Sequence, residues 1–137
     1  MKTLPILMEK LTLLLAGIVL LAVAGFILVS PAEFYAASAI DVGTDASLLN
    51  ELKAPAGLLL VTGVLMLAAI WLHGLTRPAL WMGCLVYLSY ALSRGISMVA
   101  DGLPADGLVQ AAILESLFGL ACIATLAFHG RRTGGAA

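Results

Sequence analysis

Charged residues are scarce in this sequence. Only 11% of its 137 residues are Asp, Glu, Lys or Arg, and the net charge is −1, whereas about 25% of residues are charged in a typical soluble domain. Aromatic residues make up only 7% of the chain, and no basic stretch is interleaved with them. The sequence therefore offers no nucleic-acid-binding surface, and we expect no nucleic acid among its partners.

The short motifs of common enzyme chemistry are also missing. The chain has no phosphate-binding glycine loop, no catalytic triad and no zinc-ligand spacing, which argues against hydrolase and ATPase functions. Its two cysteines, Cys84 and Cys122, form no C-x-x-C pair and lie in apolar runs, where we expect them to be inert packing residues. We predict no catalytic residue and no metal site, and no cofactor other than a quinone or a lipid.

What the sequence has in abundance is apolar side chains. Hydrophobic residues account for 62% of the chain, and the mean hydropathy is +1.10. A soluble domain of about 150 residues buries only ~70% of its unfolded surface, so a chain this apolar needs lipid as its solvent. An N-terminal signal peptide is the main competing interpretation, but the uncharged run over residues 11–32 exceeds the roughly 7 to 15 apolar residues of a signal core.

Four apolar runs approach the about 20 residues that a helix needs to cross a bilayer. They are continuous rather than alternating, which favours helices over the strands of a barrel. We predict an all-α fold, a four-transmembrane-helix antiparallel bundle that forms one integral membrane domain over residues 1–137. The predicted spans cover approximately residues 11–30, 55–73, 79–100 and 107–129.

The connections between these runs differ in length. The second and third are short and contain Gly or Pro, so the helices that they join should be antiparallel neighbours. The first connection, residues 30–54, is long, and we predict a short interfacial helical segment within residues 33–40. Ser47 is a candidate N-cap for a helical entry, and Pro55 should start or kink the second span.

The charges are distributed unequally between the two ends of this topology. The basic residues at one end are Lys2, Lys10, Arg77, Arg131 and Arg132, and the acidic residues at the other are Glu33, Asp41, Asp45, Glu51, Asp101 and Asp106. Only two basic residues, Lys53 and Arg94, fall on the acidic side. The positive-inside rule then predicts a multi-pass protein of the bacterial inner (plasma) membrane with both termini in the cytoplasm.

Two charges fall inside the predicted spans. At 1.5 Å per residue, Arg94 lies roughly 9 Å and Glu115 roughly 12 Å from the outer end of the third and fourth helices. Since a short turn joins these helices, the two side chains can pair, and pairing lowers the cost of placing charge in lipid. With the polar residues nearby they predict an outward-facing binding pocket formed by Asn50, Glu51, Lys53, Tyr87, Tyr90, Arg94, Ser97, Asp101 and Glu115.

Other interpretations of the polar residues remain open. The pair of Arg94 and Glu115 could be purely structural and fix the helix register. Ion or proton transport would need polar groups through the cytoplasmic half as well, where the sequence suggests almost none. His73 and His129 stand at cytoplasmic helix ends, where contact with water and with the helix C-terminus is expected rather than haem ligation.

Two segments carry a resemblance to a known family. The stretch Asn50-Glu51-Leu52-Lys53-Ala54-Pro55-Ala56-Gly57, and then Leu92-Ser93-Arg94-Gly95-Ile96-Ser97 through Asp101-Gly102-Leu103-Pro104, resembles the uncharacterised bacterial four-helix membrane family catalogued as domain of unknown function 4345. This family is distantly similar to DoxX-like proteins. The resemblance implies a four-helix bundle over nearly the whole chain and supplies no activity.

We therefore expect a small inner-membrane protein that is a non-catalytic accessory subunit or binding module of a larger membrane complex. Its partners would be membrane lipid and either other membrane protein subunits or further copies of itself. The alternative is a binder or enzyme for a quinone, lipid or other small amphiphile, in which an arginine holds the head group and the bundle holds the tail.

Overall fold

The structure is a computed structural model that describes the backbone of residues 3–134 and the side chains of residues 5–129. The helices are α1 (Thr3–Val29), α2 (Pro31–Ala36), α3 (Ala46–Ala68), α4 (Thr76–Asp101) and α5 (Asp106–Gly134), with a 3₁₀ turn, η1 (His73–Leu75), before α4. The four long helices are long and apolar enough to cross a membrane, so the chain is an all-α, multi-pass membrane protein as the sequence predicts. Lys2 and the side chains of Arg131 and Arg132, which contributed to the predicted orientation, lie outside the described residues.

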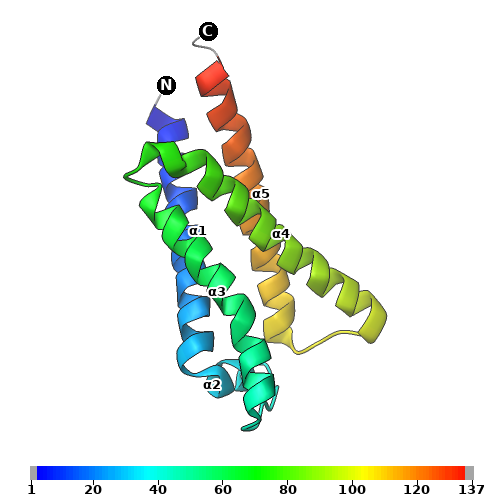
Figure 1. The fold of residues 1–137 in the computed structure, drawn as a ribbon. Helices are drawn as coiled ribbons and strands as arrows, with labels where there is room; N and C mark the ends of the chain where they lie inside the picture. The colour runs from blue at the N-terminus through cyan, green and yellow to red at the C-terminus, as the bar shows by residue number, and fades with distance from the viewer. Residues whose placement is uncertain (1–2, 135–137) are drawn as a thin grey trace.

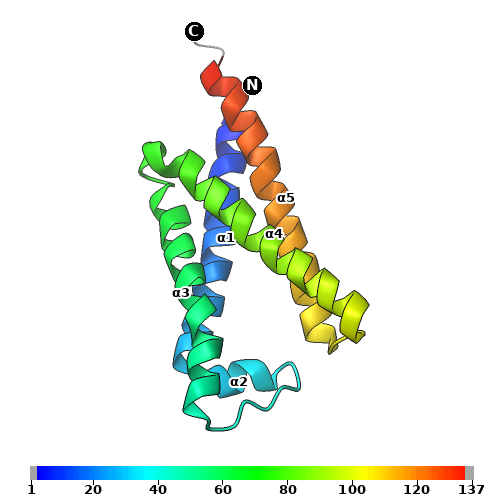
Figure 2. The same ribbon diagram turned by 45° about the vertical axis from the view of Figure 1, so that its right-hand side comes forward.

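The four long helices reverse direction one after another along the chain (Figure 1). The start of α1, η1 and the end of α5 lie at one end, called here the terminal end, while α2 and the 102–105 turn lie at the other, called the α2 end. α1 packs most extensively on α3, and α4 on α5. α4 crosses the bundle obliquely and moves away from α3 toward the α2 end (Figure 2). α4 therefore lies beside α3 at the terminal end and beside α5 toward the α2 end (Figure 2).

The start of α3 differs from the sequence prediction. Its N-cap is Asp45, whose side chain accepts a hydrogen bond of 2.8 Å from the Leu48 backbone N–H, so the candidate N-cap Ser47 was wrong. Asp45 satisfies one of the free amide groups that every helix start exposes, which Ser47 inside the first turn cannot do. Pro55 lies within α3 rather than at its start. α4 ends at Gly102, whose φ of +97° favours glycine.

Small residues allow the close approach of paired helices. A Cβ atom on Gly63 of α3 would lie 2.8 Å from Leu21 Cγ of α1, and one on Gly119 of α5 would lie 2.6 Å from Leu88 Cγ of α4. At such distances a methyl group would require the facing leucine or its helix to shift, so both glycines favour close packing. Gly25, by contrast, has open space where its Cβ would be.

The buried core runs along the length of the bundle and includes Ala24 and Ile27 of α1 and Ala56 of α3 toward the α2 end. α1 contributes Leu13, Ala16 and Leu20, which repeat at helical spacing and are at most 3% exposed. One face of α4 is buried from Thr76 as far as Tyr87, and no residue of α4 beyond Tyr87 is buried. α4 therefore packs less closely on the other helices toward the α2 end than at its start. Cys84 and Cys122 are buried and form no disulfide.

Candidate functional site

A cavity of about 530 Å³ lies inside the bundle toward the α2 end. All five α-helices contribute to its walls, and most of the lining side chains are apolar, among them Leu20, Phe26, Phe34, Leu59 and Phe118. Volumes of about 300–1,000 Å³ with mainly apolar walls and a few convergent polar groups are typical of small-molecule sites. The size and lining of this cavity match that description.

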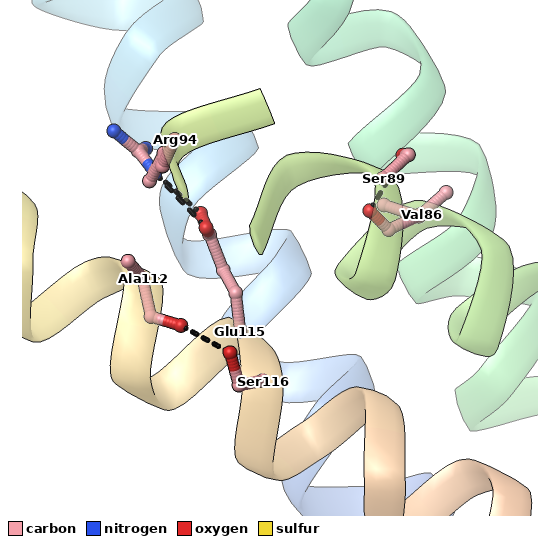
Figure 3. Close-up of polar contacts among 6 residues, drawn as sticks. All are labelled: Val86, Ser89, Arg94, Ala112, Glu115 and Ser116. Atoms are coloured by element: carbon pink, nitrogen blue, oxygen red, sulfur yellow. Dashed lines mark hydrogen bonds and ion pairs between the residues drawn. The ribbon is translucent and has the colours of Figure 1, made fainter. Parts of the chain in front are cut away.

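The charged groups of this cavity are Arg94 of α4 and Glu115 of α5. Arg94 Nε donates to both carboxylate oxygens of Glu115, at 3.1 Å to Oε1 and 2.9 Å to Oε2 (Figure 3). The side chains are 30% and 16% exposed. The two terminal amino groups of the guanidinium make no hydrogen bond to any residue in the described part of the chain. Since a guanidinium has five N–H donors, four of them stay available.

The hydroxyl groups of Ser89 and Ser116 are bound within their own helices and do not compete for this pair. Ser116, beside Glu115, donates to the Ala112 carbonyl at 2.8 Å, and Ser89 donates to the Val86 carbonyl at 2.9 Å (Figure 3). Such i−3 and i−4 contacts satisfy a hydroxyl group where no water is present. Neither serine therefore has a proton left to donate to the pair or to a ligand beside it.

Tyr87 forms a wall of the cavity rather than a ligand contact. Its hydroxyl donates a 2.7 Å hydrogen bond to the Ala16 carbonyl and so links α4 to α1. Its ring stacks on Phe118 of α5 with a centroid distance of 5.1 Å. Because the hydroxyl is buried and already bonded, Tyr87 presents an aromatic surface to the cavity and fixes the position of α4.

Two further tyrosines bring hydroxyl groups to the same cavity. Tyr90 lies one turn before Arg94 on α4, and Tyr35 reaches the cavity from α2. Neither hydroxyl makes a hydrogen bond to a described residue. Burial raises the pKa of Tyr35, and the nearby Arg94 charge offsets part of that rise. The phenol of Tyr35 is therefore protonated at neutral pH and can donate a hydrogen bond.

The remaining predicted site residues lie elsewhere. Asn50 and Glu51 are exposed and Lys53 is partly exposed on α3, on the α2-end side of Pro55, where they do not line the cavity. Ser97 donates to Asp101 at 2.9 Å on the exposed last turns of α4. All five stand near helix ends, past the enclosed part of the bundle, so the predicted pocket is smaller than the sequence suggests. Of the nine predicted residues, the structure brings together Tyr87, Tyr90, Arg94 and Glu115.

Sequence reasoning missed Tyr35 because its position depends on how α2 lies against the bundle. The predicted interfacial segment was expected to lie on the surface, yet Phe34 and Tyr35 are half-buried and line the cavity. The phenyl ring of Phe34 makes edge contacts with Phe26 of α1 at 5.7 Å and with Tyr35 at 5.2 Å. The pair of adjacent aromatic residues in a six-residue helix was the one available signal.

A second group of polar residues lies at the terminal end between α1 and α5. His129 Nδ1 is 2.9 Å from Glu9 Oε2, and Thr12 Oγ1 is 3.1 Å from Thr125 Oγ1. These four residues are called here the terminal polar cluster. Glu9 is only 8% exposed. The expectation that this half of the bundle has almost no polar groups was wrong, because α1 and α5 place theirs face to face. His129 likewise contacts a carboxylate rather than water alone.

Comparison with known proteins gives one match. The family model described as "Domain of unknown function (DUF4345)" matches residues 8–126, a range that contains both motifs and every charged or tyrosine residue of the cavity. No curated protein and no solved structure matches the chain significantly.

Proposed function

This chain belongs to the family described as domain of unknown function DUF4345, and we propose that it is a membrane binding module that holds a small amphiphile in the cavity between its helices. The resemblance to this family is confirmed, but the family description names no activity, so the proposal depends on the site. The more distant likeness to DoxX-like proteins stays a prediction.

The observation that carries the proposal is the partly used guanidinium of Arg94 in an apolar cavity. A charged side chain within a membrane span costs about 2.5–3.5 kcal/mol or more, and a structural ion pair would offset that cost best by using as many donors as possible. Here Nε alone donates to Glu115, and Arg94 lines the cavity together with Tyr35 and Tyr90. A ligand whose head group accepts hydrogen bonds would complete the site, and its tail would pack on the apolar walls.

Co-purification tests this proposal. The protein is extracted in lipid nanodiscs, and bound small molecules are identified by mass spectrometry for the native chain, Arg94→Gln and Arg77→Gln. Arg77 is the matched control, since it is an exposed arginine on the same helix. Hydrogen bonds from a charged group contribute about 1.5–3 kcal/mol, so R94Q should lose roughly ten- to a hundredfold in occupancy while R77Q keeps the ligand. Equal occupancy in R94Q and the native chain would exclude the proposal.

We further propose that the terminal end faces the cytoplasm of a bacterium and that the cavity lies toward the outer face of the inner membrane. Lys10 and Arg77 at the terminal end support this orientation through the positive-inside rule. Single-cysteine labelling tests it, because both native cysteines are buried. An impermeant thiol reagent added to intact cells should label Thr44→Cys near the α2 end and leave Gly74→Cys in η1 unlabelled; the reverse pattern would overturn the orientation.

We also propose that the module acts as an accessory subunit of a larger membrane complex or associates with further copies of itself. The second half of α4 carries exposed apolar side chains, of which Leu92, Ile96 and Val99 are 66%, 60% and 90% exposed, and a neighbouring helix would take the place of lipid on this face. Native mass spectrometry after mild extraction tests this. A lone species at the 14.1 kDa mass of one chain would count against it.

A further inference from the structure

The polar groups that face the cavity are mainly donors. The terminal amino groups of Arg94 and the hydroxyls of Tyr35 and Tyr90 are unused in the described part of the chain. Both oxygens of Glu115 accept from the single N–H group at Arg94 Nε. A head group that engages the four unused N–H donors of Arg94 must therefore offer acceptor atoms.

The charge balance of the site restricts the ligand further. Tyr35 from α2, Tyr87 and Tyr90 from α4, and the pair of Arg94 and Glu115 are the titratable or charged groups that line the cavity, and the lining residues of α1 and α3 are apolar. Since Glu115 neutralises Arg94 and the tyrosines are uncharged phenols, the site has no net charge to compensate an anion. The attraction of an anion to Arg94 would be opposed by repulsion from the Glu115 carboxylate, which is bound to Nε of the same guanidinium, and the anion would lose its hydration without a net positive charge to replace it.

From this balance we infer that the ligand is an uncharged amphiphile whose head group carries a carbonyl oxygen, as a ketone or an ester does. The inference rests on the proposed function and narrows its ligand class: ionised fatty acids and phosphate head groups are poor ligands of the native protein. The carbonyl oxygen accepts from Arg94 and from at least one of the tyrosine hydroxyls, while the aliphatic part lies along Leu20, Leu59 and Phe118.

Binding of a matched set of compounds tests the inference. Dodecanoate and methyl dodecanoate differ at the head group and share the same chain, and their affinities are measured on the nanodisc-embedded protein by competition with a fluorescent acyl methyl ester. At a pH where the acid is ionised, the ester should bind about tenfold or more tightly than the acid. Tighter binding of the acid would overturn the inference and leave the proposed function standing. If Arg94→Gln binds either compound as tightly as the native protein does, the proposed function itself is wrong.

Glu115→Gln gives the reciprocal test. This variant keeps the shape of the side chain but leaves the charge of Arg94 uncompensated, so the order should reverse and the ionised acid should bind more tightly than the ester. An unchanged order in a folded E115Q protein would overturn the inference.

Discussion

Removing either partner of the pair formed by Arg94 and Glu115 should destabilise the bundle, whereas removing both should not. In Arg94→Leu the carboxylate of Glu115, which is only 16% exposed, loses its partner; in Glu115→Leu the guanidinium, 30% exposed, loses its partner. A lone charge in a span costs about 2.5–3.5 kcal/mol, and the partial exposure of both side chains reduces this to about 2 kcal/mol for each single variant. The double variant should lie within about 1 kcal/mol of the native protein, because a buried ion pair can be replaced by apolar residues at little cost.

The assay is unfolding in mixed micelles by increasing sodium dodecyl sulfate, followed by circular dichroism. Asp101→Ala serves as the control, because it breaks the exposed hydrogen bond to Ser97 on the same helix and should change stability by less than about 0.5 kcal/mol. If the double variant loses as much stability as the two single variants together, Arg94 and Glu115 do not interact energetically. If R94L is as stable as the native protein while E115L is strongly destabilised, the two residues are not partners.

Three further predictions use the same unfolding assay. Gly119→Ala should destabilise the folded protein by about 1–3 kcal/mol, because the new methyl group meets Leu88. Gly25→Ala places its methyl group in open space and should be neutral or slightly stabilising. Equal effects of the two variants would contradict the role of Gly119 in packing α5 against α4. His129→Ala should destabilise the folded protein by about 1–3 kcal/mol, because the contact of His129 with buried Glu9 is lost. His73→Ala, at an exposed position, should have no measurable effect. If H129A is as stable as the native protein, the terminal polar cluster does not stabilise the fold. The raised pKa of Tyr35 means that the folded state favours the neutral phenol, so the contribution of this phenol to the free energy of unfolding is complete below the ordinary pKa of 10.0 and is lost as pH rises above it. Tyr35→Phe should therefore lose less stability at alkaline pH than the native protein does. An identical dependence of stability on pH in the two proteins would refute the burial of the Tyr35 hydroxyl.

The sequence predicted the long helices because each depends on a local property. A continuous apolar run of sufficient length has only one stable structure in lipid, an α-helix, whatever its neighbours are. The pairing of Arg94 with Glu115 was also predictable, since a short turn joins their helices and their distances from that turn are similar. Helix starts were less predictable, because Asp45 and Ser47 are both good capping residues and the backbone around them decides between them.

The enclosed site and the terminal polar cluster could not be predicted in the same way. Tyr35 reaches the cavity because α2 lies against α1 and α3, and no local pattern determines that contact. Glu9 and His129 are separated by 120 residues, so their contact depends on α1 packing beside α5. In both cases the residues carried the right chemistry, but the tertiary arrangement determined which of them meet.

The central claim is that Arg94 holds the head group of an amphiphile inside the bundle. An experimental density map of the protein in a lipid bilayer, with the lipids of its native membrane retained, tests this most directly. We predict elongated density in the cavity, with its polar end within hydrogen-bond distance of the terminal amino groups of Arg94 and its tail between Leu59 and Phe118. A cavity closed by side chains, with Arg94 bound through its terminal amino groups to other residues of the chain, would contradict the account.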